Sequence, residues 1–94
     1  MTELIMYYGR ECRHCHAMMP IVEKLEKEEG IKFEKKEVWH SKKNKEEIKA
    51  KRKTIEKACG GKILIPCFYS KKTNKTFCRE VPYKKLKEWA QKNR

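Results

Sequence analysis

The sequence has no long apolar run and no leader-like start. A helix that crosses a bilayer needs about 20 consecutive apolar residues, and no stretch of the 94 residues approaches that length. The chain opens with Thr2 and Glu3, whereas a secretory signal has a basic segment followed by an apolar one. We therefore expect no membrane segment and no export signal, and we expect the protein to work in the cytoplasm.

Internal repeats, linkers and low-complexity segments are also missing. A chain of this length has room for one small core, but not for a separate substrate domain or a large cofactor site. We therefore expect residues 1–94 to form a single domain that acts as a monomer and holds no bound cofactor.

Acidic residues are few, since 13 Asp and Glu stand against 25 Lys and Arg and give a formal net charge of +12. The surplus lies beyond residues 1–31, which carry 4 basic and 6 acidic side chains. Such charge attracts nucleic acid or an acidic protein partner. We favour a solvated lysine-rich surface, because the lysines are dispersed and interleaved with Glu. The aromatic residues that a nucleic-acid-binding module would use fall mainly in expected strands: Phe33, Trp39, Phe68 and Tyr69.

The number of cysteines is odd. There are five, so at least one is unpaired in a monomer, which weakens the case for a secreted disulfide scaffold. In a reducing compartment we expect Cys59, Cys67 and Cys78 to be thiols, with Cys59 as a small core residue. Because Cys67 and Cys78 flank an expected hairpin, a regulatory pair between those two is the alternative.

Hydrophobic periodicity predicts four strands and three helices. Met18, Val22 and Leu25 follow helical spacing, and charged residues occupy the other faces. The expected strands are 3–8, 31–39, 62–69 and 76–79. The expected helices are 12–29, a segment that begins at a cap on Asn44 and ends before Gly60, and a last helix that opens at Pro82.

The resulting β-α-β-α-β-β-α order predicts an α/β fold. Strands that alternate with helices imply a parallel first pair, and a hairpin over 70–75 adds antiparallel strands. We therefore expect a central four-stranded mixed sheet flanked by helices. Two prolines are unusual: Pro20 should kink the first helix, and Pro66 lies inside an expected strand, where it has no N–H to donate.

The most reactive motif is Cys12-Arg13-His14-Cys15, which follows the first strand and opens the first helix. Two thiols at this spacing form and break a disulfide with little backbone movement. A helix N-terminus favours the thiolate, which is the reactive species. In a βαβ pattern, this spacing indicates a thiol–disulfide redox site.

Two other interpretations of the motif remain open. Cys12 to His16 matches Cys-x-x-Cys-His, the attachment pattern of c-type haem, with Met18 and Met19 as nominal axial ligands. The cysteine pair could instead bind zinc with His14, His16 or a further cysteine, although no second ligand pair at zinc-finger spacing accompanies it. We favour redox chemistry without a metal, because the strand-rich pattern does not suit a small cytochrome.

Four segments together resemble the thioredoxin fold, in the small form that glutaredoxins use. Tyr8-Gly9-Arg10 ahead of the cysteine pair is similar to a glutaredoxin N-terminus. Pro20, five residues after the second cysteine, is typical of the thioredoxin active-site helix. Ile63-Leu64-Ile65-Pro66 resembles the family's strand that ends in a cis-proline, and Leu86-Lys87-Glu88-Trp89 fits its closing helix. The resemblance covers nearly the whole chain.

This resemblance implies roles for the site residues. Cys12 attacks a substrate disulfide as a thiolate, and Cys15 resolves the mixed disulfide. Pro66 faces the cysteine pair, and the backbone of Ile65 pairs with an extended substrate segment that Tyr8 borders.

The basic residues around the motif predict its redox behaviour. Arg10, Arg13 and His14 are candidates to stabilise the Cys12 thiolate. A stabilised thiolate favours the reduced form, so we expect a potential above the roughly −270 mV of thioredoxin.

The chain also departs from both subfamilies. Glutaredoxins usually hold glutathione with a Gly-Gly pair and an Asp, where this chain has Phe77 to Pro82. Met6 stands at the expected position of the buried Asp of thioredoxins. Glutathione and a thioredoxin-reductase-type flavoenzyme therefore both stay open as electron donors. The other implied partners are disulfide-containing proteins and an acidic partner for the lysine-rich surface.

Overall fold

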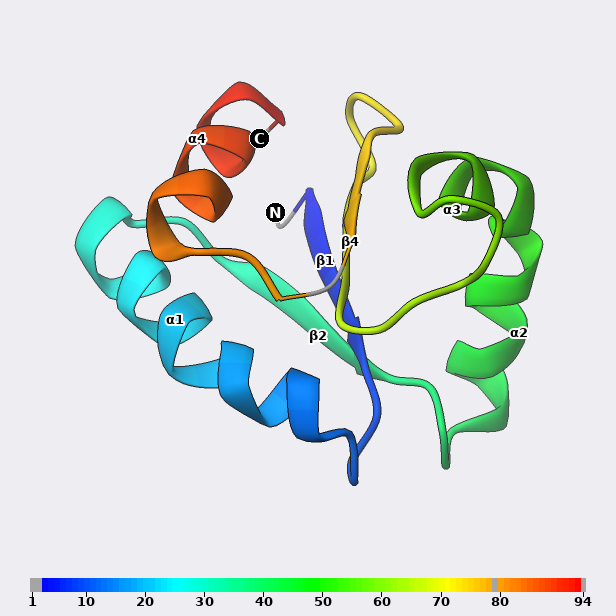
Figure 1. The fold of residues 1–94 in the computed structure, drawn as a ribbon. Coiled ribbons are helices and arrows are strands. Elements are labelled where there is room, and N and C mark those ends of the chain that lie inside the picture. The colour runs from blue at the N-terminus through cyan, green and yellow to red at the C-terminus, as the bar shows by residue number, and fades with distance from the viewer. Residues whose placement is uncertain (1–2, 79, 94) are drawn as a thin grey trace.

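The computed structural model describes residues 3–78 and 80–93. It confirms the predicted alternation of strands and helices, except that two helices replace the single middle one (Figure 1). The elements are β1 (Leu4–Tyr8), α1 (Arg13–Glu29), β2 (Phe33–Glu37), α2 (Lys42–Ala50), α3 (Arg52–Ala58), β3 (Cys67–Ser70), β4 (Thr76–Cys78) and α4 (Tyr83–Asn93).

The four strands form one mixed sheet in the order β2-β1-β3-β4. β1 pairs in parallel with β2, while β3 runs antiparallel to both β1 and β4. α1 and α4 cover one face of the sheet, and α2 and α3 cover the other (Figure 1). The expected four-stranded mixed sheet flanked by helices is therefore confirmed.

Each face of the sheet carries its own apolar cluster, and β1 contributes to both. Its alternate residues point to opposite faces, so Leu4 and Met6 join the cluster under α1 and α4, while Ile5 and Tyr7 join the cluster under α2 and α3. Burial on both faces explains why β1 is a continuous apolar run. The first cluster contains Leu4, Met6, Met18, Val22, Leu25, Ile31, Phe33, Phe68, Leu86 and Ala90. The second contains Ile5, Tyr7, Val38, Ile48, Ile55, Cys67 and Tyr69.

Several strand boundaries are narrower than the sequence predicts. β3 begins only at Cys67, so residues 62–66 of the expected strand form a loop that ends at Pro66. Proline cannot donate to the ladder, which is why pairing begins after it. β2 is confined to Phe33–Glu37 within the expected 31–39. β4 covers Thr76–Cys78, and the last residue expected in that strand, Arg79, lies outside the described residues.

The helix ends follow capping chemistry, with one correction. Ser41, not Asn44, caps α2, because its Oγ accepts the Asn44 N–H at 3.2 Å. The expected middle helix is interrupted at Lys51, between α2 and α3. α1 runs through Pro20 and ends at Gly30 in the left-handed conformation, as its sequence predicts. The kink at Pro20 stays a prediction.

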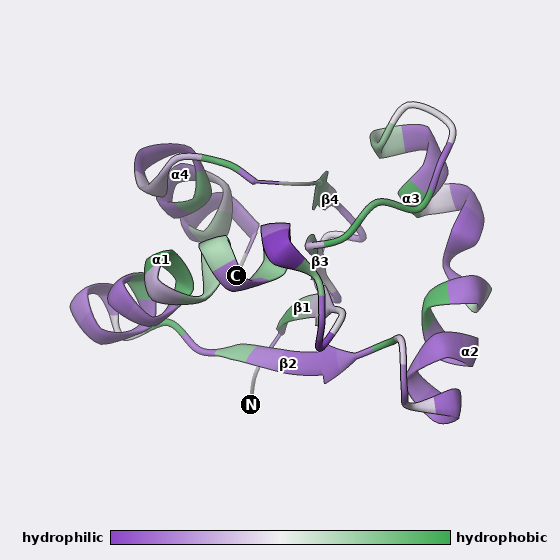
Figure 2. Ribbon diagram, turned by 60° about the horizontal axis from the view of Figure 1, so that its bottom comes forward, coloured by the Kyte–Doolittle hydropathy of each residue, from purple (hydrophilic) through white to green (hydrophobic). Residues whose placement is uncertain are grey.

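Most of α2 and β2 is coloured hydrophilic in Figure 2, which agrees with the Lys and Glu residues in both elements. In the ranges 3–78 and 80–93, none of the helices has both the length and the apolar character that a bilayer span requires.

Candidate functional site

The cysteine pair lies where β1 gives way to α1. Cys12 is the N-cap of α1, and its Sγ accepts the backbone N–H of Cys15 at 3.3 Å. The backbone N–H of Cys12 donates to the Gly9 carbonyl oxygen at 3.0 Å, which closes the turn that leads into the helix. Both cysteines are free thiols in this structure. The local geometry therefore places one sulfur at the start of the helix, against a backbone N–H donor.

Both thiols are buried, Cys15 more completely than Cys12. Cys12 is 6% exposed and Cys15 is 1% exposed. Burial raises the pKa of Cys15 to about 12, and hydrogen bonding with the Cys12 side chain adds to the increase. The Cys15 thiol is therefore protonated at neutral pH, so it must lose its proton before it can act as a nucleophile.

A hollow beside the pair joins the start of α1 to the loop before β3. Its volume is about 380 Å³, and it is lined by His14, Leu64, Ile65 and Glu80. The Ile65–Pro66 peptide bond is cis, as the resemblance implies. The part of the α3–β3 loop that approaches β3 is coloured hydrophobic in Figure 2. Tertiary packing thus brings two of the sequence-predicted site residues, His14 and Ile65, to one hollow.

Glu80 belongs to this hollow although no sequence pattern indicates it. Its Oε1 lies 2.6 Å from Nδ1 of His14, and the two residues are 66 positions apart in the chain. Both side chains are exposed. Glu80 places negative charge beside the histidine, so it partly offsets any positive charge that His14 offers to Cys12.

The remaining basic and aromatic candidates are placed less closely. The side chains of Arg10 and Arg13 are exposed, and Arg10 donates its backbone N–H to the Glu37 carboxylate. Tyr8 is half-buried and packs against the apolar cluster under α1 and α4. His16 turns toward the preceding loop, where its Nε2 lies 2.5 Å from the Arg10 carbonyl oxygen.

The metal-based interpretations of the motif gain no geometric support. In the described part of the chain, the metal-binding groups that converge are three other cysteines, and no such cluster includes Cys12 or Cys15. His14 faces Glu80, and His16 faces the Arg10 carbonyl oxygen. The histidines of the motif therefore do not complete a ligand set with its cysteines.

Glu37 connects the two loops at this end of the sheet. Its carboxylate accepts the backbone N–H groups of Arg10, Trp39, His40 and Ser41 at 2.8, 3.2, 2.6 and 3.2 Å. Partial loss of hydration raises the pKa of Glu37, but the four N–H donors outweigh this and lower it to about 2. The charged carboxylate thus holds the segment before the cysteine pair against the end of β2.

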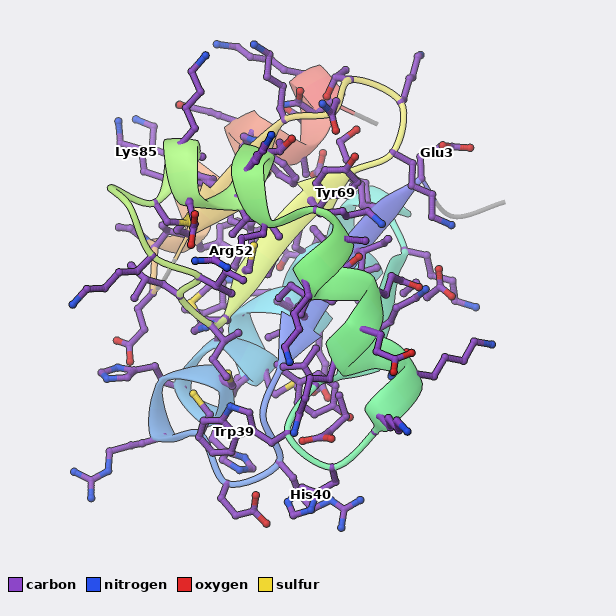
Figure 3. All side chains as sticks on the ribbon, turned by 90° about the vertical axis from the view of Figure 1, so that its right-hand side faces the viewer. Glu3, Trp39, His40, Arg52, Tyr69 and Lys85 are labelled. Carbon is purple, nitrogen blue, oxygen red and sulfur yellow. A yellow bond between two sulfur atoms is a disulfide. The ribbon has the colours of Figure 1, made fainter. Side chains whose placement is uncertain are left out.

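Trp39 lies against Gly9 in the loop before the cysteine pair, although the sequence suggested a strand residue. It is 45% exposed and follows the end of β2. A Cβ at Gly9 would lie 2.4 Å from its Cδ2, so the indole packs directly on the glycine. Figure 3 shows Trp39 at the end of the molecule where α1 begins, with His40 nearby. A glycine just before the cysteine motif is the only sequence signal for this contact.

The other three cysteines correct the sequence prediction. Cys59 and Cys78 form a disulfide, so they are neither thiols nor paired as expected. Cys67 lies opposite Cys78 in the β3–β4 ladder, as the hairpin predicts, but remains a free thiol. Burial raises its pKa to about 12. The partner of Cys78 comes instead from the end of α3, because α3 packs against β4.

Comparison with known proteins establishes the fold. No family model matches the chain, and no curated protein sequence matches it. A glutaredoxin from Archaeoglobus fulgidus superposes with a TM-score of 0.63 at 22% identity, over 94% of this chain and 85% of that one. Mitochondrial thioredoxin 3 from Saccharomyces cerevisiae, in its oxidised form, superposes with a TM-score of 0.60 at 18% identity, over 98% of this chain and 80% of that one.

Proposed function

Because the chain has the thioredoxin fold, we propose that it is a thiol–disulfide oxidoreductase that reduces or exchanges disulfides in proteins. The observation that carries this proposal is the position of the cysteine pair. Cys12 caps α1 and accepts the Cys15 N–H, while Cys15 is the more deeply buried of the two and its pKa is raised to about 12. This arrangement suits an attacking thiol and a resolving thiol that act in succession.

In the proposed reaction, the Cys12 thiolate attacks one sulfur of a substrate disulfide. The S–S bond of the substrate breaks, a mixed disulfide forms, and the first substrate sulfur leaves as a thiolate. The Cys15 thiol then gives up its proton, which ends on a departing substrate thiolate, and attacks the Cys12 sulfur. The products are a Cys12–Cys15 disulfide and a reduced substrate whose second thiolate takes its proton from water, so two electrons pass from protein to substrate.

The hollow beside the pair is the proposed binding place for an extended substrate segment. Leu64 and Ile65 supply apolar surface, and Pro66 fixes the end of the loop with its cis bond. In the ranges 3–78 and 80–93, no hydrogen bond outside the regular elements uses the N–H or carbonyl oxygen of Ile65. Those groups therefore suit pairing with a substrate backbone. Tyr8 remains a proposed border of this surface.

The same proposal includes an electron donor, a protein partner and a cellular location. An external dithiol source regenerates the protein, either glutathione or a thioredoxin-reductase-type flavoenzyme. The net charge of +12 favours an acidic protein partner. We place the monomeric protein in the cytoplasm, where such reductants maintain thiols. Measuring the redox state of Cys12 in fractionated cells would test that location.

A paired turnover assay tests the function and identifies the electron donor. Reduction of a protein disulfide is followed with glutathione and its reductase, and separately with NADPH and thioredoxin reductase. We expect turnover in one of the two systems and its loss in Cys12→Ser. A Ser41→Ala variant, which weakens the α2 cap away from the cysteines, controls for general destabilisation. Turnover that survives Cys12→Ser would contradict the proposed function.

A further inference from the structure

The disulfide and the third buried thiol form a second sulfur cluster, separate from the Cys12–Cys15 pair. Cys59 ends α3, Cys67 begins β3 and Cys78 ends β4. The three sulfur atoms all lie within 4.8 Å of one another. The proposed redox chemistry does not use any of them.

The spacing of these sulfurs is close to what a metal ion requires. A metal–sulfur bond of about 2.3 Å places the sulfurs of a trigonal or tetrahedral set about 3.8–4.0 Å apart. Reduction of the Cys59–Cys78 bond would move its two sulfurs out to contact distance, which is roughly 4 Å. Cys67 already lies within 4.8 Å of both. Metal binding would therefore require small side-chain shifts rather than a new backbone arrangement.

The surroundings favour a soft ion over a hard one. Cys67 belongs to the apolar cluster under α2 and α3, and Cys59, Ile63 and Ile65 pack against that cluster. In the part of the chain that the structure describes, no His, Asp or Glu joins the three cysteines as a fourth ligand. Structural zinc sites take four ligands, and the three cysteines fall one short of that number. Cu(I) is among the soft ions that thiolate ligands select.

We propose that the reduced protein binds one Cu(I) ion between the Sγ atoms of Cys59, Cys67 and Cys78. The Cys59–Cys78 disulfide is the oxidised, metal-free form of the same site. The strongly basic chain offsets the negative charge of three thiolates on a monovalent ion. Lys57 and Lys75 line a hollow between the segments that carry Cys59 and Cys78.

The two forms of the site interconvert by a balanced reaction. A dithiol reductant supplies two electrons and two protons, the Cys59–Cys78 bond breaks, and the reductant becomes a disulfide. Binding of Cu(I) then displaces the protons of the three thiols as the metal–sulfur bonds form. Metal binding and the disulfide therefore exclude each other.

The test isolates this cluster from the first cysteine pair. A Cys12→Ser/Cys15→Ser variant is reduced under anaerobic conditions and titrated with Cu(I) against bicinchoninate, a coloured chelator. We expect one Cu(I) per chain, and we expect bound Cu(I) to protect all three remaining thiols from alkylation. The same variant with its disulfide intact should bind no Cu(I). A reduced chain that does not compete with the chelator, or an oxidised chain that binds equally well, would overturn the proposal.

Substitution of the third ligand distinguishes a three-sulfur site from a two-sulfur one. In the same background, Cys67→Ala should weaken Cu(I) binding by more than about 100-fold, beyond the 10–100-fold typical of losing an outer partner of a ligand. Cys67→Ser supplies a second variant with a similar side-chain volume. Thr76→Val, which alters a neighbouring residue without a sulfur, should leave the affinity unchanged. Equal affinity in a folded Cys67 variant, judged by circular dichroism, would contradict the assignment.

Discussion

Cys12 and Cys15 are three residues apart, yet they have different surroundings. Cys12 accepts a backbone N–H at the start of α1, while the pKa of the buried Cys15 rises to about 12. The difference assigns the first step of the proposed reaction to Cys12 and the second to Cys15. We therefore expect the charges around Cys12 to set the redox potential, because they stabilise or destabilise the Cys12 thiolate.

We predict that His14→Ala makes the Cys12–Cys15 disulfide more reducing. The variant removes a group that can be cationic and leaves Glu80 unpaired beside the site, and both effects disfavour the thiolate. Exposed ion pairs contribute about 0.2–1 kcal/mol, which corresponds to a shift of about 5–20 mV at 1.4 kcal/mol per 30 mV. Equilibration with a glutathione redox buffer measures the potential.

The matched control is Arg52→Ala, which removes an exposed cation paired with Glu56 on α3 instead. That variant should keep the wild-type potential. A potential in His14→Ala that is unchanged, or shifted toward less negative values, would contradict the role given to His14.

Local patterns identify some site residues from sequence and leave others hidden. Cys12, Cys15 and Pro66 belong to short sequence motifs that indicate their chemistry without a structure. Glu80 is hidden because its partner His14 lies 66 positions away. The partner of Cys78 is misassigned for the same reason. Its ladder position points to Cys67, whereas packing of α3 brings Cys59 to it.

At the scale of elements, the site depends on connections between loops and helices. Glu37 holds the segment before α1 to the segment before α2, and the Cys59–Cys78 disulfide joins α3 to β4. The segments that these two connections hold in place border the cysteine pair or the hollow. Each can be weakened without touching Cys12 or Cys15.

We predict that Glu37 makes stability depend on pH in the acid range. Its pKa is about 2 in the folded protein, against an ordinary value of 4.5. Its contribution is therefore fully present above pH 4.5 and is lost as the pH falls toward 2. Urea unfolding of wild type and Glu37→Gln should show a stability difference at neutral pH that narrows over this window. A difference that stays constant from pH 7 to the lowest pH reached would argue against the four N–H bonds as its source.

We also predict that the disulfide contributes measurably to stability. Cys59 and Cys78 are 19 positions apart, and closing a loop of that size stabilises a protein by about 3 kcal/mol. A Cys59→Ala/Cys78→Ala variant should lose about that amount in denaturant unfolding under oxidising conditions. Cys67→Ala, which keeps the disulfide, should lose less. Equal losses in the two variants would show that cavity formation, rather than the cross-link, explains the change.

The boundaries of an element are harder to predict from the sequence than its presence. The apolar run over 62–69 predicts one strand, but only Cys67–Ser70 pairs with the sheet. The first part of the run is apolar because Ile63 and Ile65 pack against the cluster under α2 and α3. Leu64 and Ile65 also line the hollow. Hydrophobicity indicates packing against the core here, but it does not distinguish a strand from a partly buried loop.

At the scale of the whole molecule, the sequence specifies the architecture well. The alternation of apolar runs and amphipathic segments predicts a parallel pair and a closing hairpin, and both are present. The large positive charge is a separate property, because it does not determine the fold. We expect this charge to affect the rate at which the protein associates with charged partners.

We predict that the net charge of +12 accelerates reaction with acidic substrates. The second-order rate with an acidic disulfide peptide should fall about 10-fold between roughly 20 mM and 300 mM salt, because screening shortens the reach of the field. A neutral peptide with the same residues around its disulfide should show little change. Equal salt dependence for the two peptides would remove the argument for an acidic partner.

The central claim is that Cys12 attacks the substrate, and trapping the intermediate tests it most directly. Cys15→Ser cannot resolve a mixed disulfide, so reaction with a disulfide peptide should leave half of the peptide bound to the protein. Trypsin cleaves after Arg10 and Arg13 and thereby isolates Cys12 in the fragment of residues 11–13. Mass spectrometry without reduction should find the adduct on that fragment. An adduct on Cys67 or on the fragments carrying Cys59 and Cys78, or none at all, would contradict the account.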